Sequence, residues 1–198
     1  MSALYGLVVC GGESSRMGTD KSLLEYYGQP QRNYVFHMLQ PFCTKVLMSC
    51  NHLQSLSIPS HYNPLPDSIQ YEHIGPMAAL LTAFDLYPGI AFLVVGCDYP
   101  FLKSSDIQYL VQHRRPGKMA TSYYNHITDF YEPLLAIYEP DIQNSLLENL
   151  GQGKHSLQHL LKETDAEQVY PLTIEAIKSI DSREQHEQAL AQIKSAGF

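Results

Sequence analysis

Apolar residues along this chain are gathered in runs with the length of single strands or helices, separated by polar segments. Leu4–Cys10 and Ile90–Gly96 are continuous apolar runs, as expected of parallel strands buried on both faces, and Lys45–Cys50 is a further expected strand. Asn33–Phe42 and Pro76–Tyr87 have helical composition, with Asn33 as the expected N-cap and Pro76 at the first helical position. The alternation predicts a mostly parallel sheet with helices on both faces, a Rossmann-like three-layer α/β/α fold.

The second half of the chain predicts further, shorter elements. The expected helices cover residues 104–112, 141–150, 156–162 and 183–194, and the expected strands cover 118–124, 134–138 and 168–172. The stretch Ser55–Tyr71 is rich in Ser, Pro, Asn and His and is expected to be an extended loop. A length of 198 residues without repeats or linkers favours one domain over residues 1–198.

Composition and charge exclude several classes of protein. Hydrophobic residues make up 44% of the chain and charged residues 17%, which is typical of a globular protein rather than a disordered one. The net charge of −7 argues against a nucleic-acid partner, because phosphate backbones bind to basic surfaces. No apolar run approaches the roughly 20 residues that span a membrane, and no secretory leader is evident. Four cysteines without C-x-x-C spacing are expected to be buried free thiols, and the cytoplasm is the expected location.

The segment after the first expected strand combines glycines with positive charge. It reads GGESSRMGTDK, from Gly11 to Lys21. Gly11 and Gly12 let backbone N–H groups approach a phosphate without a Cβ in the way, and Ser14 can add a hydroxyl donor. Arg16 offers a planar fork that fits phosphate oxygens, and Lys21 adds a compact positive charge. We predict a phosphate-binding loop, distinct from the P-loop and the dinucleotide fingerprint. The alternative is an ordinary strand-to-helix loop whose glycines serve geometry alone.

A carboxylate follows the most apolar expected strand. Asp98 comes two residues after Gly96, and Pro100 fixes the chain as it leaves the strand. Ligands of parallel α/β folds bind beyond the carboxyl ends of the strands. Asp98 is therefore a candidate ligand for a Mg²⁺ ion on triphosphate oxygens. The alternative is that Asp98 only caps the next turn, where aspartate is common.

These two motifs occur together in a known family. The chain resembles the molybdenum cofactor guanylyltransferases (MobA-like NTP transferases), nucleotidyltransferases with a Rossmann-like fold of the nucleotide-diphospho-sugar transferase type. Their Gly-Gly-x-Ser-x-Arg-Met-Gly-x-Asp-Lys loop is complete here over residues 11–21. Their Cys-Asp-x-Pro strand end is present as Cys97–Pro100.

Weaker matches extend the resemblance to about residue 162. The family often has Ser-x-Asn after the second strand, here Ser49 and Asn51. It has an aspartate before a Gly-Pro helix start, here Asp67 followed by Gly75-Pro76. Pro133-Leu134 and Ser156-Leu157 are further matches.

The resemblance implies an enzyme that uses Mg²⁺. It would transfer GMP from GTP to the terminal phosphate of molybdopterin, with or without molybdenum, and release pyrophosphate. The implied catalytic residues are Arg16, Lys21 and Asp98, with Asp98 as the metal ligand. The implied binding residues are Val9, Cys10, Gly11, Gly12, Ser14, Arg16, Lys21, Asn51, Asp67 and Asp98. A carboxylate such as Asp67 suits the base site, because it can accept from the N1–H and amino groups of guanine.

The resemblance also implies how the single domain is divided and which partners it has. Residues up to about 100 would bind the nucleotide, and residues from about 101 to 198 the acceptor. The expected partners are GTP, molybdopterin or Mo-molybdopterin, and molybdoenzyme clients or other cofactor-biosynthesis proteins. No nucleic acid and no membrane are expected.

Three departures from the family pattern concern the base and acceptor sites. Ala79 replaces a glycine, and Ser179–Arg183 replaces an Asn-x-Asn-Thr-Pro segment before the last helix. Within that segment, Asp181 and Ser182 could cap the helix and line the acceptor site. Residues 117–126 match no motif, and acceptor contacts are expected there.

Two other functions remain open from the residues. One is a cytidylyltransferase or a sugar-phosphate nucleotidyltransferase of the same fold. The presence of Cys10-Gly11-Gly12, where cytidylyl relatives tend to have Ala-Ala-Gly, favours guanylyl transfer. The other is a nucleotide-binding or adaptor protein that lacks catalysis, and the intact Arg16, Lys21 and Asp98 argue against it.

The remaining polar residues predict no further site. The nine histidines are expected in loops and on solvated faces, because only His155 and His159 have helical spacing. A basic group of Lys103, Arg114, Arg115 and Lys118 is expected to be a solvated surface.

Overall fold

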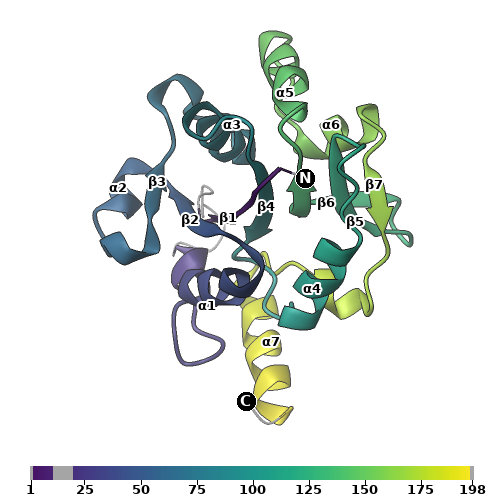
Figure 1. Ribbon diagram of the computed structural model, residues 1–198. Coiled ribbons are helices and arrows are strands. Elements are labelled where there is room, and N and C mark those ends of the chain that lie inside the picture. Colours follow the sequence, from purple (N-terminus) through teal and green to yellow (C-terminus); the bar gives the residue numbers. More distant parts are fainter. Residues whose placement is uncertain (1, 11–19, 197–198) are drawn as a thin grey trace.

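The computed structural model describes residues 2–10 and 20–196, and their seven strands form one sheet (Figure 1). The strand order is β3-β2-β1-β4-β6-β5-β7. The strands are β1 (Leu4–Val9), β2 (Lys45–Cys50), β3 (Pro64–Pro66), β4 (Ala91–Gly96), β5 (Ala120–Asn125), β6 (Phe130–Tyr138) and β7 (Glu167–Val169). Among the strands of the described residues, only β6 runs antiparallel to its neighbours, β4 and β5, so the prediction of a mostly parallel sheet is confirmed.

Helices cover both faces of the sheet, which confirms the three-layer prediction. On one face lie α1 (Gln31–Leu39) and α4 (Ser104–Gln112), and on the other lie α3 (Pro76–Leu86), α5 (Ile142–Gly151) and α6 (Leu157–Glu163). Successive strand residues point to opposite faces. Val8 therefore belongs to the core with α1, whereas Leu7 and Val9 belong to the core with α3.

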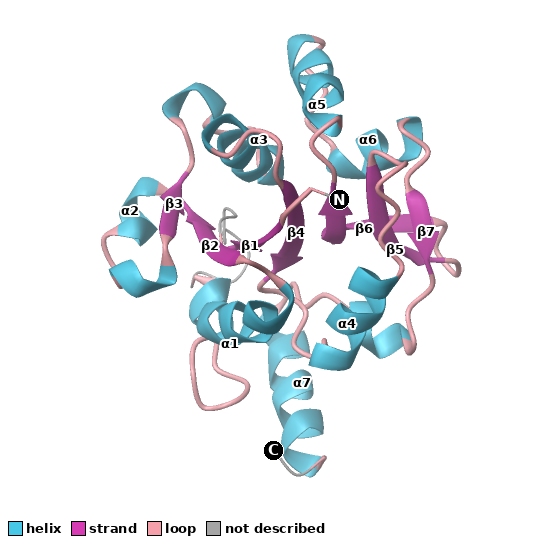
Figure 2. Cartoon of the chain, in the orientation of Figure 1, coloured by secondary structure: helices cyan, strands magenta, loops and turns pink. Residues whose placement is uncertain are grey.

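Two helices lie outside these layers. The short helix α2 (His52–Ser55) directly follows β2. The last helix, α7 (Arg183–Ser195), lies beyond α1 and α4 in the view of Figure 2. A small separate core of Tyr26, Ile180, Ala189 and Ile193 fixes α7 to the segment that follows the glycine-rich loop.

Several predicted boundaries were wrong for local reasons. Helix α1 begins at Gln31 with Pro30 as its N-cap, so Asn33 is not the cap, and the segment Gln40–Phe42 is a separate 3₁₀ turn. The expected loop over 55–71 contains the edge strand β3, whose first and last residues are prolines. Strand β6 begins at Phe130, whereas the prediction began it at residue 134. The prediction was too short because the polar Glu132 and the proline after it interrupt the apolar pattern of the strand.

Arg114 is not the solvated side chain that its neighbours in sequence suggested. Its side chain is 9% exposed, and it pairs through Nε and an amino nitrogen with Glu139, at 2.6 and 2.8 Å. Such bidentate pairs combine charge with geometry, and this one joins the end of α4 to the end of β6.

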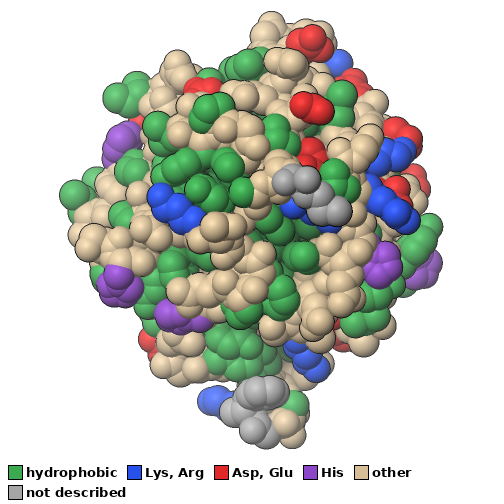
Figure 3. All heavy atoms as spheres, viewed as in Figure 1, with side chains coloured by type: hydrophobic (Ala, Val, Ile, Leu, Met, Phe, Trp, Pro, Cys, Tyr) green, Lys and Arg blue, Asp and Glu red, His purple; other side chains and the backbone are tan. Residues whose placement is uncertain are grey.

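The distribution of basic side chains and the lengths of the helices bear on the expected partners. On the face drawn in Figure 3, Lys and Arg side chains are scattered among other residues rather than gathered in one stripe. Among the described residues, no helix has the length and apolar character needed to cross a membrane.

Candidate nucleotide and metal site

Several predicted site residues that the structure describes lie where β1, β2 and β4 end. Val9 on β1 pairs with Ser49 on β2 and with Gly96 on β4. The carboxyl ends of these strands therefore lie side by side, at the edge where ligands of α/β folds bind. Asp67 is held at the same edge, because its N–H donates to the carbonyl of Cys50 at 2.9 Å.

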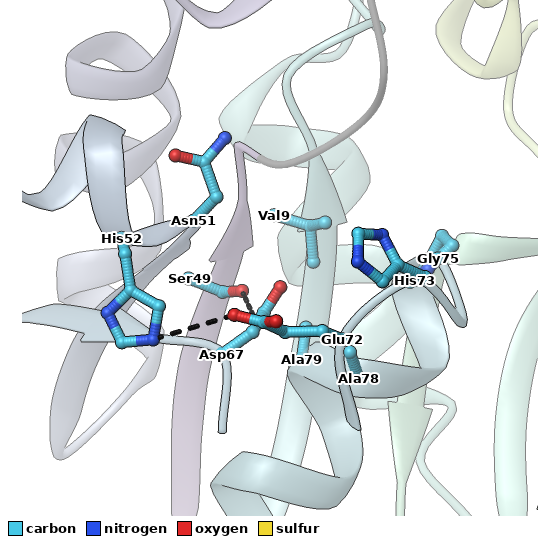
Figure 4. Close-up of a pocket in the computed structure, with 11 residues that line it drawn as sticks. Val9, Ser49, Asn51, His52, Asp67, Glu72, His73, Gly75, Ala78 and Ala79 are labelled. Carbon is cyan, nitrogen blue, oxygen red and sulfur yellow. Dashed lines mark hydrogen bonds and ion pairs between the residues drawn. The ribbon is translucent and has the colours of Figure 1, made fainter. Parts of the chain in front are cut away.

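A cavity of about 690 Å³ opens beside these strand ends (Figure 4). Its volume suits a ligand of nucleoside size. Three of the predicted binding residues line it: Val9, Asn51 and Asp67. Ala79, one of the departures from the family pattern, also lines it, together with Ser49, His52, Glu72, His73, Gly75, Pro76 and Ala78. Cys10 is buried next to the cavity and is not among its lining residues.

Asp67 is a partly buried carboxylate fixed by a neighbouring strand. The hydroxyl of Ser49 donates to its Oδ1 at 3.1 Å. Burial raises the pKa of Asp67 to about 6, and the Ser49 hydrogen bond and the nearby His52 oppose the shift. At pH 7 and above the group is therefore mostly ionised and acts only as a hydrogen-bond acceptor.

Asn51 takes part in a cap that also fixes both ends of the glycine-rich loop. Its Oδ1 accepts from the N–H of Gln54 at 2.8 Å, which leaves the amide nitrogen as the group that can donate to a ligand. Gln54 Nε2 donates to Asp20 Oδ2 at 2.8 Å and to the carbonyl of Cys10 at 3.4 Å. Gln54 thus holds the residues on either side of the loop, a role that no sequence motif indicated.

Of the glycine-rich loop, the structure describes only the last residues, Asp20 and Lys21. Gly11, Gly12, Ser14 and Arg16 lie outside the described residues. Lys21 is described, and its Nζ forms an ion pair with Asp181 Oδ1 at 2.8 Å. Asp181 belongs to the segment that departs from the family pattern before the last helix.

Asp98 follows β4 and folds back over Gly96, where a Cβ would come within 2.5 Å of Asp98 Oδ1. Among the described residues, this buried oxygen has no hydrogen-bond partner. The pKa of Asp98 is raised to about 6, chiefly by burial. The nearby charge of Asp181 contributes to the rise, and a hydrogen bond from the Asp98 backbone and the charge of Lys21 oppose it. The N–H of Ile180 donates to the Asp98 carbonyl at 2.8 Å, so the chain before α7 is fixed to this strand end.

A third carboxylate near this strand end was missed by the sequence analysis. Tyr99 donates its hydroxyl to Glu132 Oε2 at 3.1 Å. Burial raises the pKa of Glu132 to about 7, and the charge of Asp98 adds to the shift. The antiparallel register that joins Val95 to Leu135 brings the start of β6 toward Asp98. The sequence analysis looked for site residues at the carboxyl ends of parallel strands. Glu132 lies near the start of β6, which is antiparallel to β4, and so it was not found.

The three-layer fold, with a cavity beside a strand-end carboxylate, is that of a class of enzymes, the α/β nucleotidyltransferases. Within this class the chain belongs to the family described as the MobA-like NTP transferase domain, which matches residues 6–169.

Two similar proteins support the same family assignment. The molybdenum cofactor biosynthesis bifunctional protein of Synechocystis is 33% identical over 186 residues, which cover 93% of this chain and 53% of that protein. The chain thus spans about half the length of that relative. A molybdenum cofactor guanylyltransferase of Yersinia pseudotuberculosis is 29% identical over 168 residues, 84% of each chain.

A solved structure supports the fold. Molybdopterin-guanine dinucleotide biosynthesis protein A from Archaeoglobus fulgidus superposes with a TM-score of 0.78. The match covers 96% of this chain and 99% of that one, at 19% identity. The two chains therefore share the fold.

Proposed function

We propose that this chain is a guanylyltransferase that moves GMP from GTP to the terminal phosphate of molybdopterin or Mo-molybdopterin. An oxygen of the acceptor phosphate would attack the α-phosphate of GTP. The bond between the α-phosphate and the bridging oxygen to the β-phosphate would break, and pyrophosphate would leave. The products would be a guanine dinucleotide form of the cofactor and pyrophosphate.

One observation carries the proposal. A base-sized cavity with an ionisable Asp67 lies next to a strand end whose Asp98 carboxylate has an unpartnered buried oxygen, within a family of NTP transferases. The names of the relatives, a molybdenum cofactor guanylyltransferase among them, support the choice of guanine and of the acceptor.

The site residues have roles that follow from their chemistry. Nucleotidyl transfer depends on in-line positioning and on neutralising phosphate charge. Lys21 would exchange its contact with Asp181 for the triphosphate, with Arg16 and the N–H groups of Gly11 and Gly12 as further donors. Val9, Asn51 and Asp67 would hold the base, and Ser14 would add a hydroxyl to the phosphates. Cys10 would contribute its backbone, since burial raises the pKa of its thiol.

The free carboxylate oxygen of Asp98 fits a divalent cation, and the described residues gather no group of three His, Cys, Asp or Glu side chains around one. Asp98 Oδ1 is buried without a partner among the described residues, and a hard cation such as Mg²⁺ prefers carboxylate oxygen. Asp98 would hold Mg²⁺, and Asp181, whose charge raises the pKa of Asp98, is a second carboxylate in this neighbourhood. When bound, the ion would offset negative charge on the reacting phosphates.

The acceptor would approach from the C-terminal half of the domain, from about residue 101 onward. Glu132 and Asp181 flank Asp98 from that half. Three buried thiols, at Cys10, Cys50 and Cys97, are consistent with a reducing compartment, and a cytoplasmic location is part of the proposal.

Nucleotide binding tests the proposal. Calorimetry with GTP, ATP, CTP and UTP in the presence of Mg²⁺ is expected to give the tightest binding for GTP. Asp98→Ala is expected to lose the effect of Mg²⁺ on affinity, and the exposed Asp141→Ala serves as a charge-matched control. A preference for CTP would transfer the proposal to a cytidylyltransferase, and absence of nucleotide binding by the wild type would refute it.

A further inference from the structure

The base cavity contains a second carboxylate, Glu72, that the proposed function does not use. Asp67 and Glu72 both line the cavity, and Figure 4 shows their carboxylates in the same part of it, near His52. The charge of Glu72 raises the pKa of Asp67, as expected of neighbouring acids. The two carboxylates differ in their environment. Asp67 accepts a hydrogen bond from the buried Ser49 on β2, whereas the Glu72 side chain is 42% exposed.

The segment that presents Glu72 is anchored to α3 by hydrogen bonds from Ser68, Gln70 and Tyr71. The N–H of Ser68 donates to the hydroxyl of Thr82 at 2.9 Å. The buried Tyr71 donates its hydroxyl to Asp85 at 2.8 Å. Glu72 directly follows Tyr71, so its position is set by residues that lie outside the cavity.

The Glu72 side chain also contacts a histidine from another element. His52 Nε2, from α2, lies 3.9 Å from Glu72 Oε1. The dashed line in Figure 4 marks this contact. His52 and Glu72, which both line the cavity, therefore touch each other at its wall.

Guanine presents two hydrogen-bond donors side by side on one edge. These are its N1–H and its exocyclic 2-amino group, and an ionised carboxylate only accepts. Hypoxanthine keeps the N1–H and lacks the amino group. One carboxylate can accept both donors through its two oxygens, but Ser49 already donates to Asp67 Oδ1. This leaves Asp67 Oδ2 for one donor of guanine and makes Glu72 the acceptor at hand for the other.

We propose that Glu72 is a specificity-determining residue that accepts a hydrogen bond from the 2-amino group of guanine, while Asp67 accepts from N1–H. The inference rests on the proposed function, since it presumes that GTP is the nucleotide. His52 is then a positioning residue that acts through Glu72.

Comparison of GTP with ITP, which lacks only the amino group, tests the assignment. Dissociation constants would be measured by calorimetry with Mg²⁺ for the wild type, Glu72→Ala, Glu72→Gln and the control Glu187→Ala. Glu187 also lies in an exposed ion pair, with Arg183 at 3.3 Å, on the distant helix α7. Hydrogen bonds to charged groups imply that the wild type binds GTP roughly tenfold or more tightly than ITP.

Glu72→Ala is expected to reduce this preference to near parity by weakening GTP binding and leaving ITP binding within about threefold of the wild type. Glu72→Gln, which keeps the shape, is expected to fall between the two, and Glu187→Ala to match the wild type. A wild-type preference retained in Glu72→Ala, or an equal loss of GTP and ITP affinity, would overturn the assignment while GTP binding by the wild type stands. Absence of GTP binding by the wild type would instead overturn the proposed function, and the assignment with it.

Discussion

Gly96→Ala is expected to disable catalysis without removing any functional group. A Cβ at this position would lie 2.5 Å from Asp98 Oδ1, whereas ordinary contact begins at 3.4 Å. The carboxylate must therefore move by roughly 0.9 Å, the difference between these distances. Leu134 limits the alternatives, because its Cβ lies 3.2 Å from the new methyl group on the other side.

The expected effect on rate follows from this displacement. A shift of about 1 Å at a reacting centre costs on the order of 100-fold in rate. We expect kcat for GMP transfer to fall by that factor, and the Mg²⁺ concentration needed for half-maximal rate to rise. GTP binding without Mg²⁺ is expected to change by less than about threefold, because the cavity around Asp67 is untouched.

Loss of folding is a separate outcome that the design controls for. The backbone of Gly96 does not have a positive φ, so alanine is allowed there. The free energy of unfolding, measured by thermal denaturation, should change by only about 1 kcal/mol. Gly117→Ala, whose Cβ would meet nothing within 4 Å, is the matched control and should behave as the wild type. A Gly96→Ala enzyme that is folded and has wild-type kcat and Mg²⁺ dependence would refute the role of Asp98.

Three further predictions concern groups whose environment the structure defines. Because burial raises the pKa of Asp98 to about 6, the folded chain retains a proton that the unfolded chain releases above its ordinary pKa of 3.8. The stability that protonated Asp98 confers is therefore lost as the pH rises from 3.8 through about 6. The free energy of unfolding of Asp98→Asn should exceed that of the wild type by up to about 3 kcal/mol near pH 7.5 and by little near pH 3.5. Urea unfolding curves that are the same for both proteins at both pH values would contradict this. Arg114→Ala leaves Glu139, which is 3% exposed, without its partner and should cost about 3–5 kcal/mol of unfolding free energy with GTP affinity unchanged; a loss below about 1 kcal/mol would show that the pair is not structural. Ser49→Ala removes the hydrogen bond to Asp67 and should weaken GTP binding by about fivefold, measured by calorimetry, unless the bond does not position the carboxylate.

The apolar runs were sufficient to predict the layers of the fold. Leu4–Cys10 and Ile90–Gly96 become the adjacent central strands β1 and β4, because strands covered on both faces must be apolar throughout. Strand β6 was only partly predicted and its direction not at all, since an antiparallel strand joined by a hairpin leaves no distinct apolar pattern. The short strand β3 was missed because two of its three residues are prolines, which only an edge strand tolerates.

For the site, contiguous motifs were predictable and long-range neighbours were not. Asp98 could be identified from its place after a buried strand, and Asn51 and Asp67 from family resemblance. Glu72 and Gln54 carry no motif, and their roles depend on contacts with segments far along the chain. His52 and His73 were expected as solvated residues, and the structure brings both to the cavity. Their sequence neighbours give no indication of this, because His52 is placed by the helix that follows β2 and His73 by the segment that follows β3.

The reaction itself gives the most direct test of the account. Purified chain would be incubated with molybdopterin, Mg²⁺ and each nucleoside triphosphate in turn, and the dinucleotide and pyrophosphate would be quantified. The account predicts equal amounts of both products with GTP, little product with ATP, CTP or UTP, and loss of turnover in Asp98→Ala. Product formation from CTP in preference to GTP, or no turnover by a wild-type chain that binds GTP and Mg²⁺, would contradict it.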